Sequence, residues 1–108
     1  MTTLEYHVLL ALADGPLYGY AIKDAVAEES DGTLTPLAGT LYRIIARLMS
    51  DRLVTEAKPD GAPEPHPGLT RKYYALTAAG RRTLGAEARR LKQTAVVAEK
   101  RLGLVRGT

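Results

Sequence analysis

A hydroxyl and two guanidinium groups recur at helical spacing near the middle of the chain. Thr40, Arg43 and Arg47 stand at i, i+3 and i+7, so a helix would place them on one face. Guanidinium groups donate paired hydrogen bonds to guanine edges and phosphate oxygens, which makes this row a candidate contact for nucleic acid. Taken alone, the two arginines are more typical of a plain solvated helix surface.

The charges of the chain are distributed unevenly. Residues 1–70 hold five Lys/Arg against ten Asp/Glu, a net charge of −5, whereas residues 71–108 hold ten against two, a net charge of +8. An asymmetry of this kind predicts a surface that meets a polyanion, with a solvated basic helix as the alternative. Arg71 and Lys72 open the basic half.

Residues suited to catalysis or metal binding are sparse in the sequence. Cysteine is absent, and His7 and His66 lie far apart with no acidic partner at a suggestive spacing. The sequence therefore predicts neither an enzyme, nor a metal site, nor a cofactor. The longest apolar run, residues 8–13, has six residues and is too short to cross a membrane. The first residues lack the features of a secretion signal, so we expect a cytoplasmic protein.

The hydrophobic pattern predicts three helices followed by two short strands. In the third helix Leu41, Ile45 and Leu48 recur at i, i+4 and i+7 as the buried stripe, on a different face from the arginines. In the second, the stripe contains one polar residue, Glu29. The helices are expected within residues 4–13, 18–29 and 35–53, the strands at 53–57 and 71–76, and a loop rich in Pro and Gly at 59–68. This order is mainly α with a small β-hairpin, the architecture of a winged helix-turn-helix.

A fourth helix, expected from residue 78 onward, carries a heptad pattern. Its apolar residues are spaced +4, +3, +4, +3, +4: Leu84, Ala88, Leu91, Ala95, Ala98 and Leu102. Such a seam favours a partner subunit, and the alternative is a helix that folds back over the first one. The first helix is apolar on nearly every side and needs a second surface, so Leu4 and Val8 join the expected homodimer contact. We expect residues 1–77 to form a DNA-binding domain and residues 78–108 a dimerisation helix.

Three segments also resemble one protein family, in its order and spacing. Residues 9–22 (LLALADGPLYGYAI) resemble the opening signature of PadR-type transcriptional regulators, LLALL-x-x-GPLHGYEI, with Tyr18 where His is common. Residues 39–48 (GTLYRIIARL) are similar to the recognition helix of that family, GTLY-x-x-L-x-R-L. Residues 71–80 (RKYYALTAAG) are similar to its wing exit, R-K-Y-Y-x-L-T-x-x-G.

The resemblance implies a dimeric repressor that binds an inverted-repeat operator in double-stranded DNA and controls nearby genes, often its own. The tyrosine of the GTLY block maps to Tyr42, which is assigned a phosphate contact, and Thr40 lies beside it near the helix start. Arg43 and Arg47 are candidates for guanine edges or phosphates. The remaining candidates for DNA contact are Arg71 and Lys72 at the base of the wing, Lys23 on the second helix and His66 in the loop. For His66 a solvated loop histidine is the alternative.

The resemblance also implies a small aromatic or amphipathic effector near the dimer interface. Tyr6 is the single aromatic residue of the first helix, so a pocket between Tyr6, Val8 and the last helix is one interpretation. A dry, well-packed interface is the other. A winged-helix module that binds protein instead of DNA is the competing functional class, and it would lack the Thr40, Arg43 and Arg47 face.

Overall fold

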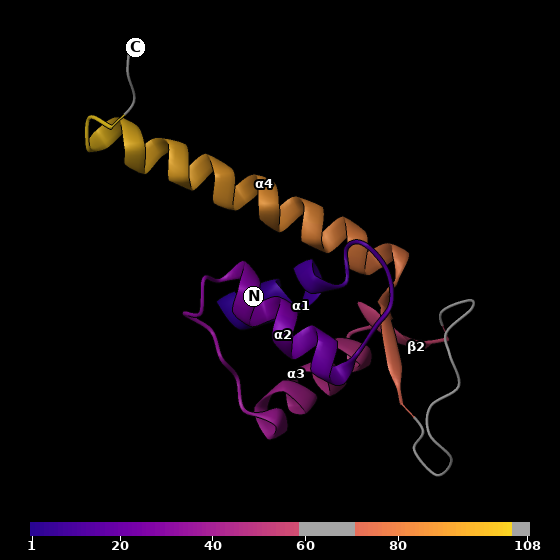
Figure 1. The fold of residues 1–108 in the computed structure, drawn as a ribbon. Helices are drawn as coiled ribbons and strands as arrows, with labels where there is room; N and C mark the ends of the chain where they lie inside the picture. Colours follow the sequence, from indigo (N-terminus) through magenta and orange to yellow (C-terminus); the bar gives the residue numbers. More distant parts are fainter. Residues whose placement is uncertain (59–70, 105–108) are drawn as a thin grey trace.

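The computed structural model describes residues 1–58 and 71–104, and it consists mainly of helices (Figure 1). The expected loop at residues 59–68, with His66, lies outside the described residues. In chain order the elements are α1 (Thr3–Ala11), β1 (Leu17–Tyr18), α2 (Gly19–Glu29), α3 (Ala38–Ser50), β2 (Val54–Ala57), β3 (Tyr73–Leu76) and α4 (Ala78–Arg101). The predicted winged helix-turn-helix with one long C-terminal helix is confirmed.

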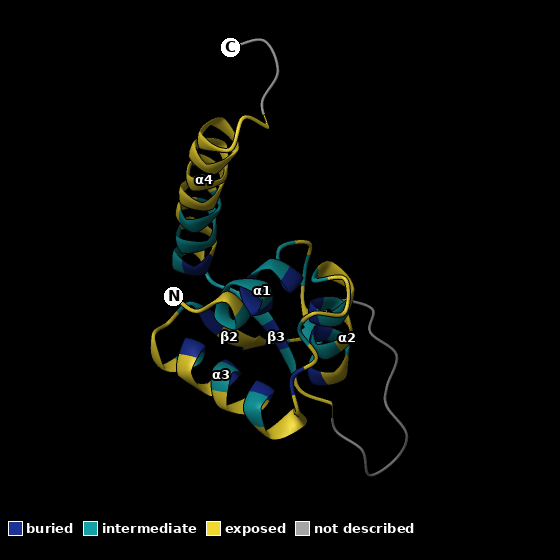
Figure 2. Ribbon diagram, turned by 90° about the vertical axis from the view of Figure 1, so that its left-hand side faces the viewer, coloured by how far each residue is buried: buried dark blue, intermediate teal, exposed yellow. Residues whose placement is uncertain are grey.

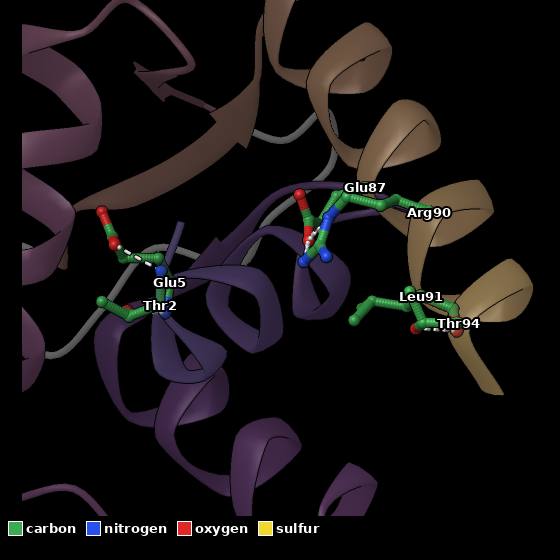
Figure 3. Close-up of polar contacts among 6 residues, drawn as sticks. All are labelled: Thr2, Glu5, Glu87, Arg90, Leu91 and Thr94. Atoms are coloured by element: carbon green, nitrogen blue, oxygen red, sulfur yellow. Dashed lines mark hydrogen bonds and ion pairs between the residues drawn. The ribbon is translucent and has the colours of Figure 1, made fainter. Parts of the chain in front are cut away.

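The core lies where α1, α2 and α3 meet. Leu41, Ile45 and Leu48 are all buried, so the stripe predicted for α3 is confirmed. The other fully buried large side chains come from α1, its C-cap and α2: Val8, Leu9, Leu12, Ile22 and Val26. A reciprocal cap starts α1, because the Thr2 backbone N–H donates to Glu5 Oε1 at 2.9 Å and the Glu5 N–H donates to Thr2 Oγ1 at 3.1 Å (Figure 3).

The small sheet has a third strand that the sequence pattern did not reveal. Its order is β1-β3-β2, and β1 pairs antiparallel with β3, Leu17 opposite Tyr74 and Tyr18 opposite Tyr73. The second helix was expected to begin at Tyr18, and this expectation was wrong, since Tyr18 is extended and α2 begins at Gly19. A strand of two residues is too short to show an alternating pattern, so only its pairing with β3 defines it.

Three hydrogen bonds fix the start of α4: one caps the helix, and two join it to residues earlier in the chain. The Thr77 hydroxyl accepts from the Gly80 N–H at 2.9 Å and donates to the Arg52 carbonyl at 2.7 Å. Arg81 Nη1 donates to the Ala13 carbonyl, just beyond α1, at 3.2 Å. These contacts direct α4 across α1 and out of the helical body (Figure 1).

The far half of α4 leaves the domain. Leu84 packs against the core, but every residue from 89 to 104 is exposed in the single chain (Figure 2). Val8, which was expected at a dimer surface, has no exposed area because its side chain belongs to the buried core of the single chain. Among the described residues no helix combines the length and hydropathy needed to cross a bilayer.

Candidate nucleic-acid interface

The two faces of α3 differ sharply in exposure. Leu41, Ile45 and Leu48 face the core, whereas Tyr42, Arg43 and Arg47 are exposed on the outer side of the helix (Figure 2). Thr40 is half-buried one turn before Arg43. The structure therefore places the predicted hydroxyl and guanidinium row on an accessible helix surface. No ion pair of Arg43 or Arg47 is found among the described residues.

The beginning of α3 is suited to an anion. Its N-cap, Leu37, supplies no side-chain hydrogen bond, and no acidic residue occupies the first turn. The first N–H groups of a helix have no partner within the helix, and their dipoles point outward. A phosphate group would satisfy them, because helix N-termini carry a partial positive charge.

Tyr42 joins this helix to the start of α2. Gly19, the first residue of α2, lies so close to the Tyr42 hydroxyl and ring that a side chain at Gly19 would collide with them. Tyr74 of β3 lies on the same side and is buried. Burial raises the pKa of Tyr74, and the neighbouring Tyr42 and Glu56 raise it further. Tyr74 therefore remains a neutral phenol.

The basic residues at the base of the wing adjoin this tyrosine cluster. The Arg71 guanidinium lies over the Tyr18 ring, 4.6 Å from its centre. Lys72 Nζ is 3.7 Å from Glu56 Oε1, and both side chains are well exposed, so this pair contributes little to stability. Lys23 is half-buried and follows the exposed Tyr20 by three residues on α2, so it stands one helical turn along the same face.

Two groupings were not expected from the sequence. Tyr18, Tyr20 and Tyr74 gather beside Tyr42, which only the β1–β3 pairing reveals. His7 Nδ1 lies 3.7 Å from Glu29 Oε2, although the two residues are far apart in the sequence. Glu29 is the single polar residue in the stripe of the second helix, and this was the sequence signal that could have revealed the pair.

The His7–Glu29 pair links α1 to α2 inside the domain and stands apart from the arginine row. Burial raises the pKa of Glu29, and the adjacent His7 partly opposes that rise. Tyr6, the predicted effector residue, packs edge-on against the His7 ring with 5.7 Å between the ring centres. No group of three or more His, Asp or Glu side chains suited to a metal ion occurs in the part of the chain that the structure describes.

Three helices, a small antiparallel sheet and an exposed basic face on the third helix define a winged helix-turn-helix protein. A sequence profile of the Transcriptional regulator PadR-like family matches residues 8–86, and the chain belongs to this family. The X-ray structure of a PadR-like transcription factor from Bacteroides fragilis is similar, with 31% identity, a TM-score of 0.72 and coverage of 90% of this chain and 87% of that one.

Two further proteins are similar over part of their own length. The crystal structure of Bacillus subtilis PadR in complex with operator DNA is similar at 25% identity and a TM-score of 0.65, over 81% of this chain and 47% of that chain. A 37.1 kDa protein of a Streptomyces fradiae transposon is 43% identical over 81 residues. The match covers 75% of this chain and 21% of that protein, so it spans about a fifth of this relative's length.

Proposed function

We propose that this protein is a dimeric, sequence-specific DNA-binding repressor that controls nearby genes, including its own. The observation that carries the proposal is the outer face of α3, where Arg43 and Arg47 are exposed above a fully buried apolar stripe. A helix with this face fits the major groove of B-DNA. The likeness to Bacillus subtilis PadR, whose crystal structure contains operator DNA, supports the proposal.

Each candidate residue has a role in the proposed complex. Arg43 and Arg47 contact base edges, while Thr40 and Tyr42 near the α3 start hold a phosphate. Arg71 and Lys72 contact the backbone beside the site, and Lys23 adds a phosphate contact from α2. His66 lies outside the described residues and is assigned to the loop that meets the flanking DNA. Residues 1–77 are the DNA-binding domain in this scheme.

Dimerisation is assigned to residues 78–108. The predicted seam continues past Leu84 into a region where Leu91 is 38% and Leu102 71% exposed. Ala95 and Ala98, on the same side, allow a second helix to approach closely. A two-fold dimer would cover this apolar stripe with its own copy. Val8 is excluded from the contact because it is fully buried within one chain.

The remaining seam residues fit the same two-fold contact. Ala88 is half-buried between Leu84 and Leu91 along the stripe, so it lies where α4 begins to leave the domain. Leu4 is half-buried and packs against the core, and its exposed part lies on α1, which α4 crosses. A partner helix that follows the stripe would therefore reach both residues.

The test is binding to duplex DNA from the region upstream of the protein's own gene, measured by fluorescence anisotropy. Arg43→Ala and Arg47→Ala should each weaken binding to the preferred duplex by about 1–3 kcal/mol, roughly 5-fold to 150-fold. Arg89→Ala is the matched control, because it removes the same charge from an exposed position on α4. Affinities that stay within twofold for both α3 variants would reject the α3 interface. An absence of binding to any duplex would favour the winged-helix module that binds protein.

A further inference from the structure

The positive charge of α4 has no part in the operator contacts proposed above. Those contacts take Arg71 and Lys72 from the ten cations of residues 71–108. α4 itself carries seven Lys/Arg against two Glu, a net charge of +5. One of the seven, Arg90, forms an ion pair with Glu87, and α4 has no other ion pair in the part of the chain that the structure describes. Most of its cations are therefore free to meet an anion.

Three of these cations form a row along the outer side of α4. Arg82, Arg89 and Lys100 stand at i, i+7 and i+18, so the helical repeat places them within about 20° of one line and over about 27 Å. All three are exposed. Leu84, which packs against the core, is turned about 160° from Arg82. The row of Arg82, Arg89 and Lys100 therefore faces away from the domain and from the predicted seam.

No acidic side chain interrupts this basic row. The two acidic residues of α4, Glu87 and Glu99, are turned from it by about 140° and 100°. Lys92 joins Arg89 and Lys100 in the lining of one open surface hollow of about 790 Å³. Cations that stand together without an anion among them create a positive potential that attracts a polyanion.

The side chains around the basic row favour the phosphate backbone of duplex DNA over other polyanions. α4 has no aromatic side chain on which single-stranded bases could stack. Val96 and Val97 are the large apolar side chains that line the hollow, which is too little for the desolvated core of a protein interface or for insertion into a bilayer surface. Duplex DNA carries one charge per about 1.7 Å of its axis, so it offers phosphates along the whole row.

The basic row and the outer face of α3 lie on different sides of the molecule. In both ribbon views α1 lies between α4 and α3 (Figures 1 and 2). The row is also turned away from the side of α4 that meets the domain, where Leu84 packs. A straight duplex that follows α3 therefore does not reach the row.

We propose that the basic row of α4 binds the phosphate backbone of a second DNA duplex, without reading its sequence, while α3 holds the operator. The protein would then bring two DNA segments together. This bridging rests on the function proposed above, whereas the binding of duplex DNA by the row does not. In a dimer joined along the seam, both rows face outward, because each lies opposite the seam of its own helix.

The first experiment measures a second duplex on a protein that already holds the first. Operator duplex from the upstream region is fixed to a biosensor, loaded with protein, and then exposed to a 30-base-pair duplex of unrelated sequence. We expect the unrelated duplex to bind, and its log K to fall with log salt with a slope of about −3, as three phosphate contacts require. A loaded surface that takes up no second duplex at 50 mM salt would overturn the proposal.

Matched pairs of variants locate the second site. Arg89→Gln combined with Lys100→Gln removes two cations from the row, and should lower affinity for the unrelated duplex at least tenfold and reduce the salt slope by about 2. Arg90→Gln combined with Arg101→Gln is the control, since it removes the same charge from the adjacent positions, about 100° around the helix. The control should change affinity less than twofold, and both pairs should load onto the operator like the wild type. Equal losses in the two pairs would show an effect of total charge and would contradict the row.

Competition identifies the class of polyanion. Poly-L-glutamate and vesicles that contain phosphatidylserine are added to the loaded surface at the same charge concentration as unlabelled unrelated duplex. We expect the duplex to displace the bound second duplex at least tenfold more effectively than either competitor. Equal displacement by poly-L-glutamate would indicate a surface for acidic protein, and equal displacement by the vesicles would indicate a membrane surface. Either result would overturn the assignment to DNA.

A final variant separates the row from the repressor function. Arg43→Ala combined with Arg47→Ala should fail to load onto the operator, yet bind the unrelated duplex in fluorescence anisotropy with the same dependence on Arg89 and Lys100. A wild-type protein that prefers no upstream sequence but shows this dependence would reject the repressor function and leave the row intact. A protein that binds its operator with no dependence of the second duplex on the row would do the reverse.

Discussion

The glycines at positions 80 and 85 should respond to alanine in opposite directions, although both lie in α4. A Cβ at Gly80 would overlap the carbonyl oxygen of Leu53, which is backbone, and would also lie 3.3 Å from a Leu76 methyl carbon. The same Leu53 carbonyl accepts the Thr77 N–H at 3.0 Å, so it cannot shift without disturbing the start of the helix. A Cβ at Gly85 meets nothing within 4 Å.

The magnitudes follow from these contacts. Overpacking against fixed backbone costs about 1–3 kcal/mol, and weakening the Thr77 hydrogen bond adds about 1 kcal/mol. The better helix propensity of alanine offsets up to about 1 kcal/mol of this. Gly80→Ala should therefore lower the free energy of unfolding by about 1–3 kcal/mol. Gly85→Ala gains the propensity alone and should raise it by about 0.5–1 kcal/mol.

Thermal unfolding followed by circular dichroism at one fixed protein concentration measures both variants. Each 1 kcal/mol should shift the Tm by roughly 4 °C for a chain of this size, so the two variants should differ clearly. A Gly80→Ala protein as stable as Gly85→Ala would refute the close packing of α4 on the Leu53 backbone. The placement of α4 derived from that contact would then be wrong.

Four further results are expected. Leu91→Glu places a charge in the proposed seam and should shift the protein toward monomer or unfolding, as measured by light scattering. Val96→Glu, which lies away from the seam, should not do so. A stable monomer of the unmodified protein at micromolar concentration would contradict the dimer. Arg71→Ala or Lys72→Ala should weaken all DNA sequences alike and reduce the salt dependence of log K by about 1, and a base-specific effect would contradict the backbone assignment. Half-sites of the operator should lie about 34 Å apart, roughly 10 base pairs. Tight binding that survives a five-base-pair insertion between the half-sites would show that the two α3 helices of a dimer do not bind the operator in this way. Hydrogen bonds from Thr2 lower the pKa of the Glu5 carboxyl. The wild type should therefore be more stable than Glu5→Gln above the ordinary carboxyl pKa, and this advantage should vanish as pH falls through the lowered pKa. A difference in unfolding midpoint that stays constant with pH would contradict this.

The face of α3 was predictable because a helix repeats every 3.6 residues. The positions of Leu41, Ile45 and Leu48 fix which side is buried, and Arg43 and Arg47 then fall on the exposed side whatever the rest of the chain does. The expected order of helices and strands rests on the same local information. The extent of dimer contact and the DNA contacts themselves remain predictions.

Long-range contacts were outside the reach of these local rules. Tyr18 was assigned to a helix from the local hydrophobic pattern. Its pairing with Tyr73, which makes it a strand residue, is a long-range contact that this pattern does not contain. The wing-exit motif ends on Gly80, but the physical reason for glycine there, its close packing on the Leu53 backbone, comes only from the tertiary structure. Val8 was placed at a dimer surface, because an apolar helix shows that it needs neighbours without showing which ones.

By itself, the sequence determined the helices, their buried faces and the basic row on α3, because hydrophobic periodicity and charge act over a few residues. The tertiary structure decided which faces meet. It gathered four tyrosines with Arg71 around one cavity, paired β1 with β3, and directed α4 away from the domain. These features depend on residues tens of positions apart, whose proximity is set by the packing of the whole core and not by any local pattern.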